Sequence, residues 1–319
     1  MYELLSFLSG VILAVMIQAN GGLSGQFGVY HAALYVHIVG SAFAVLLLLI
    51  KHQSVSGAKG LPLWMYLGGV IGVLTTVFNN LAFSHISLTS IVALGLFGQL
   101  VLSYFIDRFG LLGMERRRQD LSVPSVLLSI LGIALMLDGP SSGGWGYILI
   151  SLGAGVSVVL SRTVNAHLSE HIGALQGSLI NHLAGLPACL LLAIIIPEQA
   201  VTQPFRLWIW CGGVLGVLIV VICNITVPKL PAYRLTLFTL CGQLFCGIVL
   251  DVLLGGTLNQ REFGAGLLVA AGIISNQLLK LRQQKKAERE REYRERIARI
   301  EQEYRDYIYN RGNTKKEKE

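Results

Sequence analysis

The amino-acid sequence predicts an all-α integral membrane protein. We expect ten transmembrane helices, arranged as two inverted-topology repeats of five, and a charged cytoplasmic helix at the C-terminus. Hydrophobic residues make up 53% of the 319-residue chain and charged residues only 13%, whereas a soluble domain carries about a quarter charged residues. The charges also concentrate near the C-terminus, and one long stretch of the sequence occurs twice. A chain of this composition is expected to face lipid rather than water.

The duplicated stretch covers residues 64–107 and 208–251, which align at a constant shift of 144 residues. Fourteen of the 44 positions are identical, and many of them are polar or glycine, which a shared apolar composition does not explain. Such an internal repeat indicates a duplicated structural unit. The identical pairs include Trp64 with Trp208, Gly68 with Gly212, Gly69 with Gly213, Gly72 with Gly216, Asn80 with Asn224, Gln99 with Gln243, and Asp107 with Asp251.

A transmembrane helix needs about 20 apolar residues, and five segments in each repeat meet this requirement. They are residues 4–22, 30–50, 62–81, 86–107 and 120–138, and then 145–163, 172–196, 206–227, 233–254 and 263–280. The linker between the repeats is rich in Gly and Ser, which favour turns. The expected domains are therefore a first repeat at 1–138, a linker at 139–144, a second repeat at 145–280 and a charged tail at 281–319.

Because each repeat contains five helices, the second must enter the membrane from the side opposite to the first. The basic residues of the loops agree with this arrangement. With a cytoplasmic N-terminus, nine basic residues fall in the inner loops and two in the outer loops, as the positive-inside rule requires. Both termini are thus expected in the cytoplasm of a multi-pass plasma-membrane protein. Inverted repeats that meet near the bilayer midplane are typical of secondary transporters.

Six amide side chains in the predicted spans are candidates for lining a substrate cavity, because polar groups are costly in lipid and tend to face the bundle interior. The repeat relates them in pairs, the first of which aligns at a shift of 145. The pairs are Asn20 and Asn165, Asn80 and Asn224, and Gln99 and Gln243. Each also has a structural interpretation. The asparagines lie at predicted helix ends that they could cap, and the glutamines could hydrogen-bond across the repeat interface.

Four further paired residues are candidates for proton or charge coupling. His37 and His182 lie within the second and seventh spans and could exchange protons near neutral pH, although a lone histidine in a membrane is more often a structural hydrogen-bonding group. Asp107 and Asp251 lie where the fourth and ninth spans leave the membrane. Asp107 is followed by Arg108, so a surface ion pair is its simplest role.

Arg162 is a fifth candidate for charge coupling, and its repeat counterpart is the apolar Ile17. A long basic side chain can keep its stem in the membrane while its charge reaches the interface. We expect Arg162 to extend to the cytoplasmic interface in this way. The alternative is that it binds an anionic group of the substrate.

The residue pattern supports no enzyme, cofactor or metal site, because it contains no nucleophile constellation, phosphate-binding loop or metal-ligand spacing. The five cysteines lie in apolar runs and are expected to be buried hydrophobic side chains. The net charge of +7 includes +5 from the residues after 279, where 14 basic and 9 acidic residues lie, so the membrane part carries only +2. Nucleic-acid binding is therefore not expected.

The tail consists of strong helix formers with interleaved opposite charges, which favour a solvated helix. Apolar or aromatic side chains recur in it at three- and four-residue spacing, at Tyr293, Ile297, Ile300, Tyr304, Tyr307 and Ile308. This stripe could contact a cytoplasmic partner or the membrane surface, or it could simply support the helix.

The run GGVIGV…NN…ALGLFGQLVLSYFIDRFGLLG in the first repeat resembles the YdcZ-type membrane proteins of the drug/metabolite transporter superfamily, which includes EamA-like transporters. The resemblance covers residues 1 to 280 as two fused units, although the second matches more loosely after Asp251. It implies a ten-helix bundle with a central path for a small molecule. Small multidrug relatives use a membrane-embedded Glu in the first helix, where this chain has only Gln18 and Asn20. Simple proton-for-cation antiport is therefore not expected.

We accordingly expect a secondary-active transporter that exports or exchanges a small metabolite or drug-like molecule by alternating access. Its expected partners are the lipid bilayer and a small-molecule substrate, coupled to protons or another ion. The alternative is a non-transporting membrane scaffold or sensor that recruits a cytoplasmic partner through the charged tail.

Overall fold

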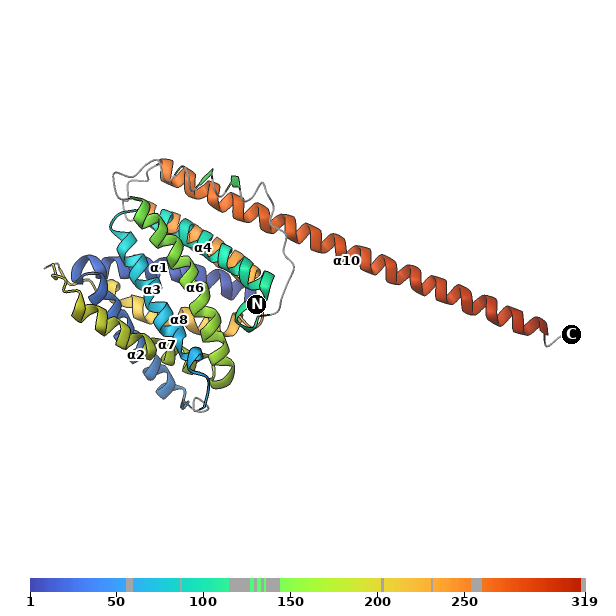
Figure 1. Ribbon diagram of the computed structural model, residues 1–319, viewed down its shortest axis with the longest axis horizontal. Helices are drawn as coiled ribbons and strands as arrows, with labels where there is room; N and C mark the ends of the chain where they lie inside the picture. The colour runs from blue at the N-terminus through green and yellow to red at the C-terminus, as the bar shows by residue number, and fades with distance from the viewer. Residues whose placement is uncertain are drawn as a thin grey trace. The chain divides into compact units, whose positions relative to one another are not determined.

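The computed structural model is all-helical in the residues that it describes, which are 1–55, 60–86, 88–114, 127–128, 131–132, 135, 144–201, 204–230, 232–253 and 260–316. Contacts divide the chain into two compact units, Met1–Ile274 and Ser275–Glu319. The first half contributes α1 (Tyr2–Phe27), α2 (Val29–Ile50), η1 (Leu63–Tyr66), α3 (Leu67–Phe83), α4 (Leu88–Phe109) and η2 (Leu111–Gly113) (Figure 1). The second contributes α6 (Gly144–Ile172), α7 (Ala174–Ile195), η3 (Leu207–Trp210), α8 (Cys211–Thr226), α9 (Ala232–Leu253) and α10 (Gln260–Lys316).

Seven of the described helices are long and apolar enough to cross a membrane. They correspond to the first four predicted spans and to the sixth, seventh and eighth. The predicted span at 120–138 lies largely outside the described residues, while α9 and α10 occupy the positions of the ninth and tenth. The membrane-spanning character of the chain is therefore confirmed, and the count of ten spans stays a prediction. Exposed side chains such as Leu49 and Ile194 suit a lipid-facing surface.

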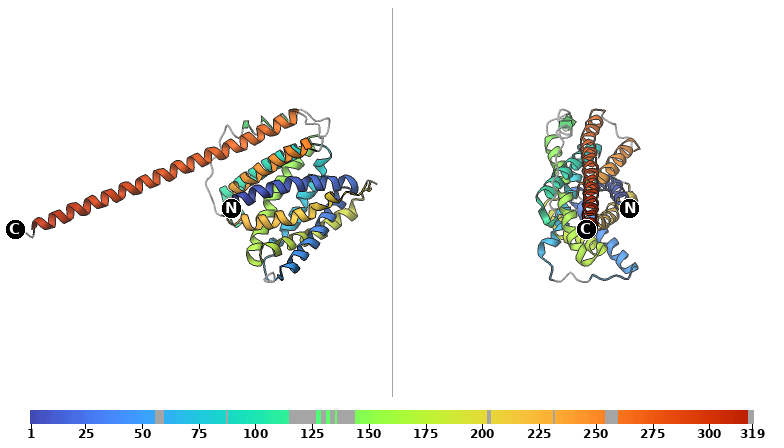
Figure 2. Two further views of the ribbon diagram at one scale, coloured as in Figure 1. Left: turned by 180° about the vertical axis from the view of Figure 1, so that it is seen from behind. Right: turned by 90° about the vertical axis from the view of Figure 1, so that its right-hand side faces the viewer.

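The helices of the two halves pack against each other in corresponding pairs. Helix α1 packs most extensively against α9 and α8 (Figures 1 and 2), and its counterpart α6 packs in the same way against α4 and α3. Helix α2 crosses its own counterpart α7, and α4 crosses α9. The core therefore forms between the halves rather than within each half, so neither half has a complete interior of its own.

Glycines permit the closest of these helix crossings. A Cβ atom at Gly10 of α1 would lie 2.0 Å from the carbonyl oxygen of Thr239 in α9, and one at Gly155 of α6 would lie 1.8 Å from that of Gly95 in α4. Since positions 10 and 155 are repeat counterparts, the same contact is built twice. Small residues at such crossings let helix backbones approach closely in a membrane, where van der Waals packing drives helix association.

Two other glycines set the ends of α1 and α6. Gly28 (φ 87°) and Gly173 (φ 102°) have backbone angles that favour glycine, and each separates a first helix from the next. The prediction that Asn20 and Asn165 end their helices is wrong, because α1 and α6 continue to Phe27 and Ile172. Each of these two helices ends instead at the glycine with a positive φ that follows it.

The second unit consists of the C-terminal part of α10. The expected helix is present through Lys316, and the side chains of residues 282–304 are exposed, including Tyr293, Ile297, Ile300 and Tyr304.

Candidate functional site

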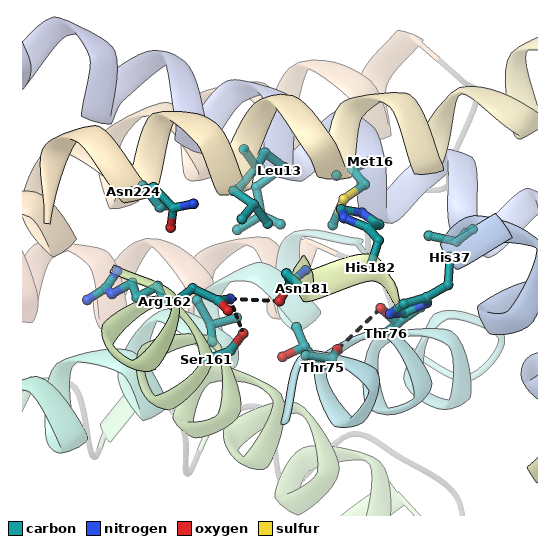
Figure 3. A pocket seen from close by; sticks show the side chains of 18 residues that line it. Leu13, Met16, His37, Thr75, Thr76, Ser161, Arg162, Asn181, His182 and Asn224 are labelled. Atoms are coloured by element: carbon teal, nitrogen blue, oxygen red, sulfur yellow. Dashed lines mark hydrogen bonds between the residues drawn. The ribbon is translucent and has the colours of Figure 1, made fainter. Parts of the chain in front are cut away.

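A cavity of about 110 Å³ lies inside the first unit, lined by α1, α2, α3, α6, α7 and α8. Helices of both halves therefore contribute to it. Figure 3 shows its lining, with α3 and α6 on one side and α1 and α8 on the other. The cavity is small compared with the 300–1,000 Å³ of typical ligand pockets, but it approaches the volume of about 150 Å³ that holds benzene in an engineered protein.

One wall of the cavity is polar. Asn165 of α6 donates from Nδ2 to Asn181 Oδ1 of α7 at 2.7 Å and to Ser161 Oγ at 3.2 Å. Ser161 in turn donates to the carbonyl oxygen of Gly68 in α3 at 2.8 Å. This network joins α3, α6 and α7 and holds its amide and hydroxyl groups in fixed directions, as fully bonded buried networks do. Thr75 and Thr76 of α3 extend the polar wall.

The opposite wall is mostly apolar, and its polar members are His37 of α2 and Asn224 of α8. Leu13 and Met16 of α1 lie on this side (Figure 3). The cavity lining also includes Val36 of α2 and Ile219 and Val220 of α8. These side chains offer no hydrogen-bonding group except the weakly accepting thioether of Met16. The cavity therefore presents two chemically different surfaces to any molecule inside it.

Arg162 lies in the polar wall, and its side chain is only 7% exposed. Its Nη1 donates to Gln99 Oε1 at 3.4 Å, and its Nη2 donates to Ser103 Oγ at 3.2 Å and to Thr236 Oγ1 at 2.7 Å. The expectation that Arg162 extends to the cytoplasmic interface is wrong. The hydroxyl and amide acceptors of α4 and α9 hold the guanidinium inside the bundle instead.

The two paired histidines meet across the α2–α7 crossing. The rings of His37 and His182 lie 5.7 Å apart between centroids, and both line the cavity. Each Nδ1 is 2.9 Å from a main-chain carbonyl oxygen four residues earlier in its own helix. Because a carbonyl can only accept, Nδ1 carries the proton in both rings, which leaves each Nε2 as the proton-accepting atom. Each ring also packs against a glycine of the other helix, His182 on Gly40 and His37 on Gly185.

The paired amides divide between the cavity and the helix contacts. Asn165 and Asn224 line the cavity. Asn80 Nδ2 donates to the Val29 carbonyl oxygen at 3.3 Å, and Asn224 Nδ2 donates to that of Ala174 at 2.9 Å. These acceptors are the first residues of α2 and α7, so both asparagines stabilise the breaks that follow α1 and α6.

The remaining amide candidates lie outside the main cavity. Asn20 is buried against Gly212, as its counterpart Asn165 is against Gly68. Gln99 and Gln243 line a separate space of about 10 Å³ between α1, α3, α4, α6 and α9. That volume is at the lower limit for one water molecule, so it does not hold a substrate in this conformation.

Of the two paired aspartates, the structure describes the side chain of Asp107 but not that of Asp251. Asp107 is only 2% exposed, so a surface ion pair with Arg108 is the wrong interpretation of it. It lies one turn beyond Ser103 on α4 and interacts electrostatically with Arg162 from outside the cavity lining. The side chain of Asp251 lies outside the described part of the chain.

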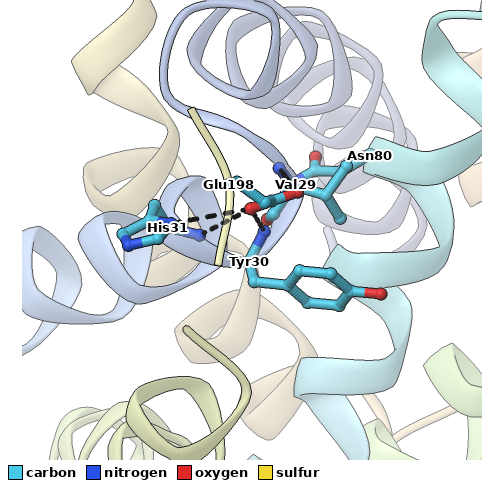
Figure 4. Close-up of polar contacts among 5 residues, drawn as sticks. All are labelled: Val29, Tyr30, His31, Asn80 and Glu198. Carbon is cyan, nitrogen blue, oxygen red and sulfur yellow. Dashed lines mark hydrogen bonds and ion pairs between the residues drawn. The ribbon is translucent and has the colours of Figure 1, made fainter. Parts of the chain in front are cut away.

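A second polar cluster connects the α7–α8 loop to the start of α2 (Figure 4). The Glu198 carboxylate accepts the main-chain N–H groups of Val29 and Tyr30, each at 2.8 Å, and lies 3.6 Å from His31 Nδ1. A helix N-terminus favours a negative charge because its first N–H groups lack partners within the helix. Glu198 therefore fixes this loop to the break after α1, next to Asn80.

Comparisons with known proteins place the chain in a family. A family model described as "Putative inner membrane exporter, YdcZ" matches residues 1–139 and 146–275. The chain belongs to this family. It is thus a multi-pass protein of the inner membrane in an exporter family. A solved crystal structure has a TM-score of 0.64 and 14% sequence identity to this YdcZ-family chain, over 87% of it and 97% of the other chain, which shows a shared fold. No curated protein matches the chain.

Several polar-wall residues of this YdcZ-family protein were not among the predicted site residues. Thr75, Ser161 and Asn181 were missed because the prediction favoured polar residues that both repeats share. Their repeat counterparts are apolar: Ile219, Met16 and Val36. A comparison of the two repeats for polar residues with apolar counterparts would have found them. Among the described residues, no group of three or more His, Cys, Asp or Glu side chains could hold a metal ion.

Proposed function

We propose that this YdcZ-family protein is a secondary-active transporter that exports or exchanges a small molecule by alternating access. In this proposal ten transmembrane helices form two inverted repeats of five, with both termini in the cytoplasm. The observation that carries the proposal is the cavity between the two halves, lined by repeat-related helices. Inverted-repeat transporters bind their substrates at such an interface near the bilayer midplane and move one part against the other around it.

The arrangement of the contacts supports a rocking motion. Each helix of one half packs mainly on the other half, and the crossings at Gly10 and Gly155 bring backbone against backbone. A rearrangement that exchanges the roles of the two halves would produce a second state with its cavity open to the opposite side. The Glu198 cluster is then the contact that must loosen when the cavity opens toward the loop that contains Glu198.

The cavity residues receive separate roles in this proposal. Asn165 and Asn224 contact the substrate, while His37 and His182 exchange protons through the Nε2 atoms that face the α2–α7 crossing. Asn20, Asn80, Gln99 and Gln243 keep the helices in register. Asp107 stabilises the positive charge of Arg162 from the α4 side, outside the cavity lining. Asp251 is the proposed counterpart of Asp107 in the second repeat.

Reconstitution into liposomes tests the function directly. Purified full-length protein should move at least one compound from a panel of labelled metabolites and drug-like molecules, and the flux should depend on an imposed proton or sodium gradient. A His37→Gln, His182→Gln double variant should keep substrate exchange but lose stimulation by a pH gradient. Folded protein that moves no compound in the panel would contradict the proposal.

A scaffold role is favoured by one observation, the exposed charged helix of the second unit. In that case the tail would carry the function and the membrane part would only anchor it. Deletion of residues 281–319 separates the two proposals, because a transporter keeps its flux without the tail and a scaffold loses its cellular effect.

A further inference from the structure

The two walls of the cavity come from corresponding residues of the two repeats that differ in polarity. At three repeat-related pairs the polar member lies on α6 or α7 and the apolar member on α1 or α2. These are Ser161 with Met16, Asn181 with Val36, and Arg162 with Ile17; of these six residues only Ile17 lies outside the cavity lining. At two others the polar member lies on α3 and the apolar member on α8: Thr75 with Ile219, and Thr76 with Val220.

This distribution separates the cavity by polarity. Helices α3, α6 and α7, which pack together, supply the polar members, and α1, α2 and α8, which also pack together, supply the apolar ones. A cavity built from two identical repeats would present the same groups on both sides. The difference between the walls therefore favours a ligand that is itself polar on one side and apolar on the other.

Arg162 sets the charge of the polar wall. Its described hydrogen bonds use three of the five N–H donors of a guanidinium, and all three acceptors are uncharged groups outside the cavity lining. None of the described lining residues is acidic. Asp107 acts on Arg162 from the α4 side, away from the cavity lining. A charged arginine in a membrane interior is retained at a cost, and the cavity side of this one faces only neutral groups.

We propose that the cavity binds a small amphipathic organic anion. Its carboxylate accepts hydrogen bonds from Arg162 and from the Asn181 amide nitrogen, while Asn181 Oδ1 still accepts from Asn165. Its apolar part packs on Leu13, Met16 and Ile219. A guanidinium is suited to a carboxylate because its planar N–H groups match the two oxygens. The proposal rests on the proposed function, since it takes this cavity to be the transport site.

The volume of the cavity defines the probes. About 110 Å³ is less than the roughly 150 Å³ that holds benzene, so a single six-membered ring with one substituent is the largest suitable probe and requires some expansion of the cavity. Benzoate, benzamide and benzylamine share this ring and differ in charge, which is negative, neutral and positive at pH 7. They therefore report the effect of charge at nearly constant shape.

The test is thermal unfolding of the purified full-length protein in detergent, titrated with each probe at constant ionic strength. Benzoate should stabilise the protein with an apparent affinity about 10- to 100-fold above that of benzamide, the range expected for a charge-assisted hydrogen bond. Benzylamine should not stabilise it. Equal effects of benzoate and benzamide, or a preference for benzylamine, would overturn the proposal.

Variants assign the preference to Arg162. Arg162→Gln should remove the advantage of benzoate over benzamide and Arg162→Lys should keep part of it. Arg206→Gln removes a charge from an exposed loop residue and should leave the advantage unchanged. A full advantage in Arg162→Gln would refute the assignment.

A second variant keeps the proposal testable if Arg162→Gln does not fold. Ile219→Thr copies Thr75 onto the apolar wall and should weaken benzoate binding more than binding of the smaller, more polar lactate. Equal losses for both acids would contradict the apolar wall. The transport proposal and the anion-site proposal also fail differently. Binding that is specific for acids but gives no flux contradicts only the transport proposal, whereas flux of cations alone contradicts only the anion-site proposal.

Discussion

A methyl group added at Gly155 should disrupt the α4–α6 crossing. The new Cβ atom would lie 1.8 Å from the Gly95 carbonyl oxygen and 2.9 Å from the main-chain nitrogen of Gln99. Ordinary contact begins at 3.4 Å, so the two helices must separate by roughly 3.4 − 1.8 = 1.6 Å. A shift of that size would also lengthen the 3.4 Å hydrogen bond between Arg162 and Gln99 beyond its useful range.

The expected cost follows from two opposing effects. Overpacking in a close-packed interior costs about 1–3 kcal/mol, while replacing glycine by alanine within a helix gains about 1 kcal/mol. Because the contact here is with a backbone that cannot rotate away, we expect Gly155→Ala to lower the free energy of unfolding by about 1–2 kcal/mol. Its repeat counterpart Gly10→Ala, with a contact of 2.0 Å, should behave alike.

Unfolding of the purified protein by heat or by denaturing detergent measures this effect. Gly146→Ala is the matched control, since Gly146 lies in the same helix and an added Cβ there meets nothing within 4 Å. The control should be neutral or slightly stabilising. If Gly155→Ala proves as stable as Gly146→Ala, the close crossing of α4 and α6 is not present in the membrane protein.

Three further predictions concern the loop cluster, the topology and the tail. Glu198→Ala should lower the free energy of unfolding by about 0.5–2 kcal/mol, as loss of a helix cap does. Glu170→Ala, at a half-exposed side chain, should leave stability unchanged in the same assay. Reporter fusions after His52 should report cytoplasm and fusions near Ser141 the exterior. The reverse would contradict the predicted orientation, and both fusions on one side would contradict the inverted repeats. A chain without residues 281–319 should retain liposome flux within about twofold, a tolerance set by the uncertainty of additive effects between separate units, and loss of flux would assign the tail a part in transport.

The pairing of the helices could be predicted in part from the sequence, because the repeat appears as identities at fixed spacing. The shared glycines predicted close packing, and Gly68 and Gly212 indeed lie against Asn165 and Asn20. The partners of each crossing could not be predicted, since periodicity within one helix does not reveal which helix faces it. The prediction that Asn20 ends the first helix failed for a related reason: the backbone angle at Gly28 decides that end, and the sequence contains several other glycines nearby.

The candidate site was predicted less well, and the reason is physical. Several residues that both repeats share serve the geometry of the helix breaks and crossings, which both repeats need. Asn80 of α3 and Asn224 of α8 illustrate this, because each donates to the carbonyl oxygen of the first residue of the preceding helix, α2 or α7. A binding surface requires the two walls to differ. Arg162 and Asn181, whose counterparts are apolar, therefore lie in the cavity although the repeat does not predict them.

The central claim is that one cavity opens alternately to the two sides of the membrane, and Cys223 allows a direct measurement because it lines that cavity. In a variant that keeps Cys223 as its only cysteine, membrane-impermeant thiol reagents are applied to right-side-out and to inside-out vesicles. A variant that keeps only Cys189, buried beside His37 and outside the cavity lining, is the control and should resist labelling from both sides. Alternating access predicts that Cys223 is labelled from both sides. Labelling from one side only, or from neither, would contradict it.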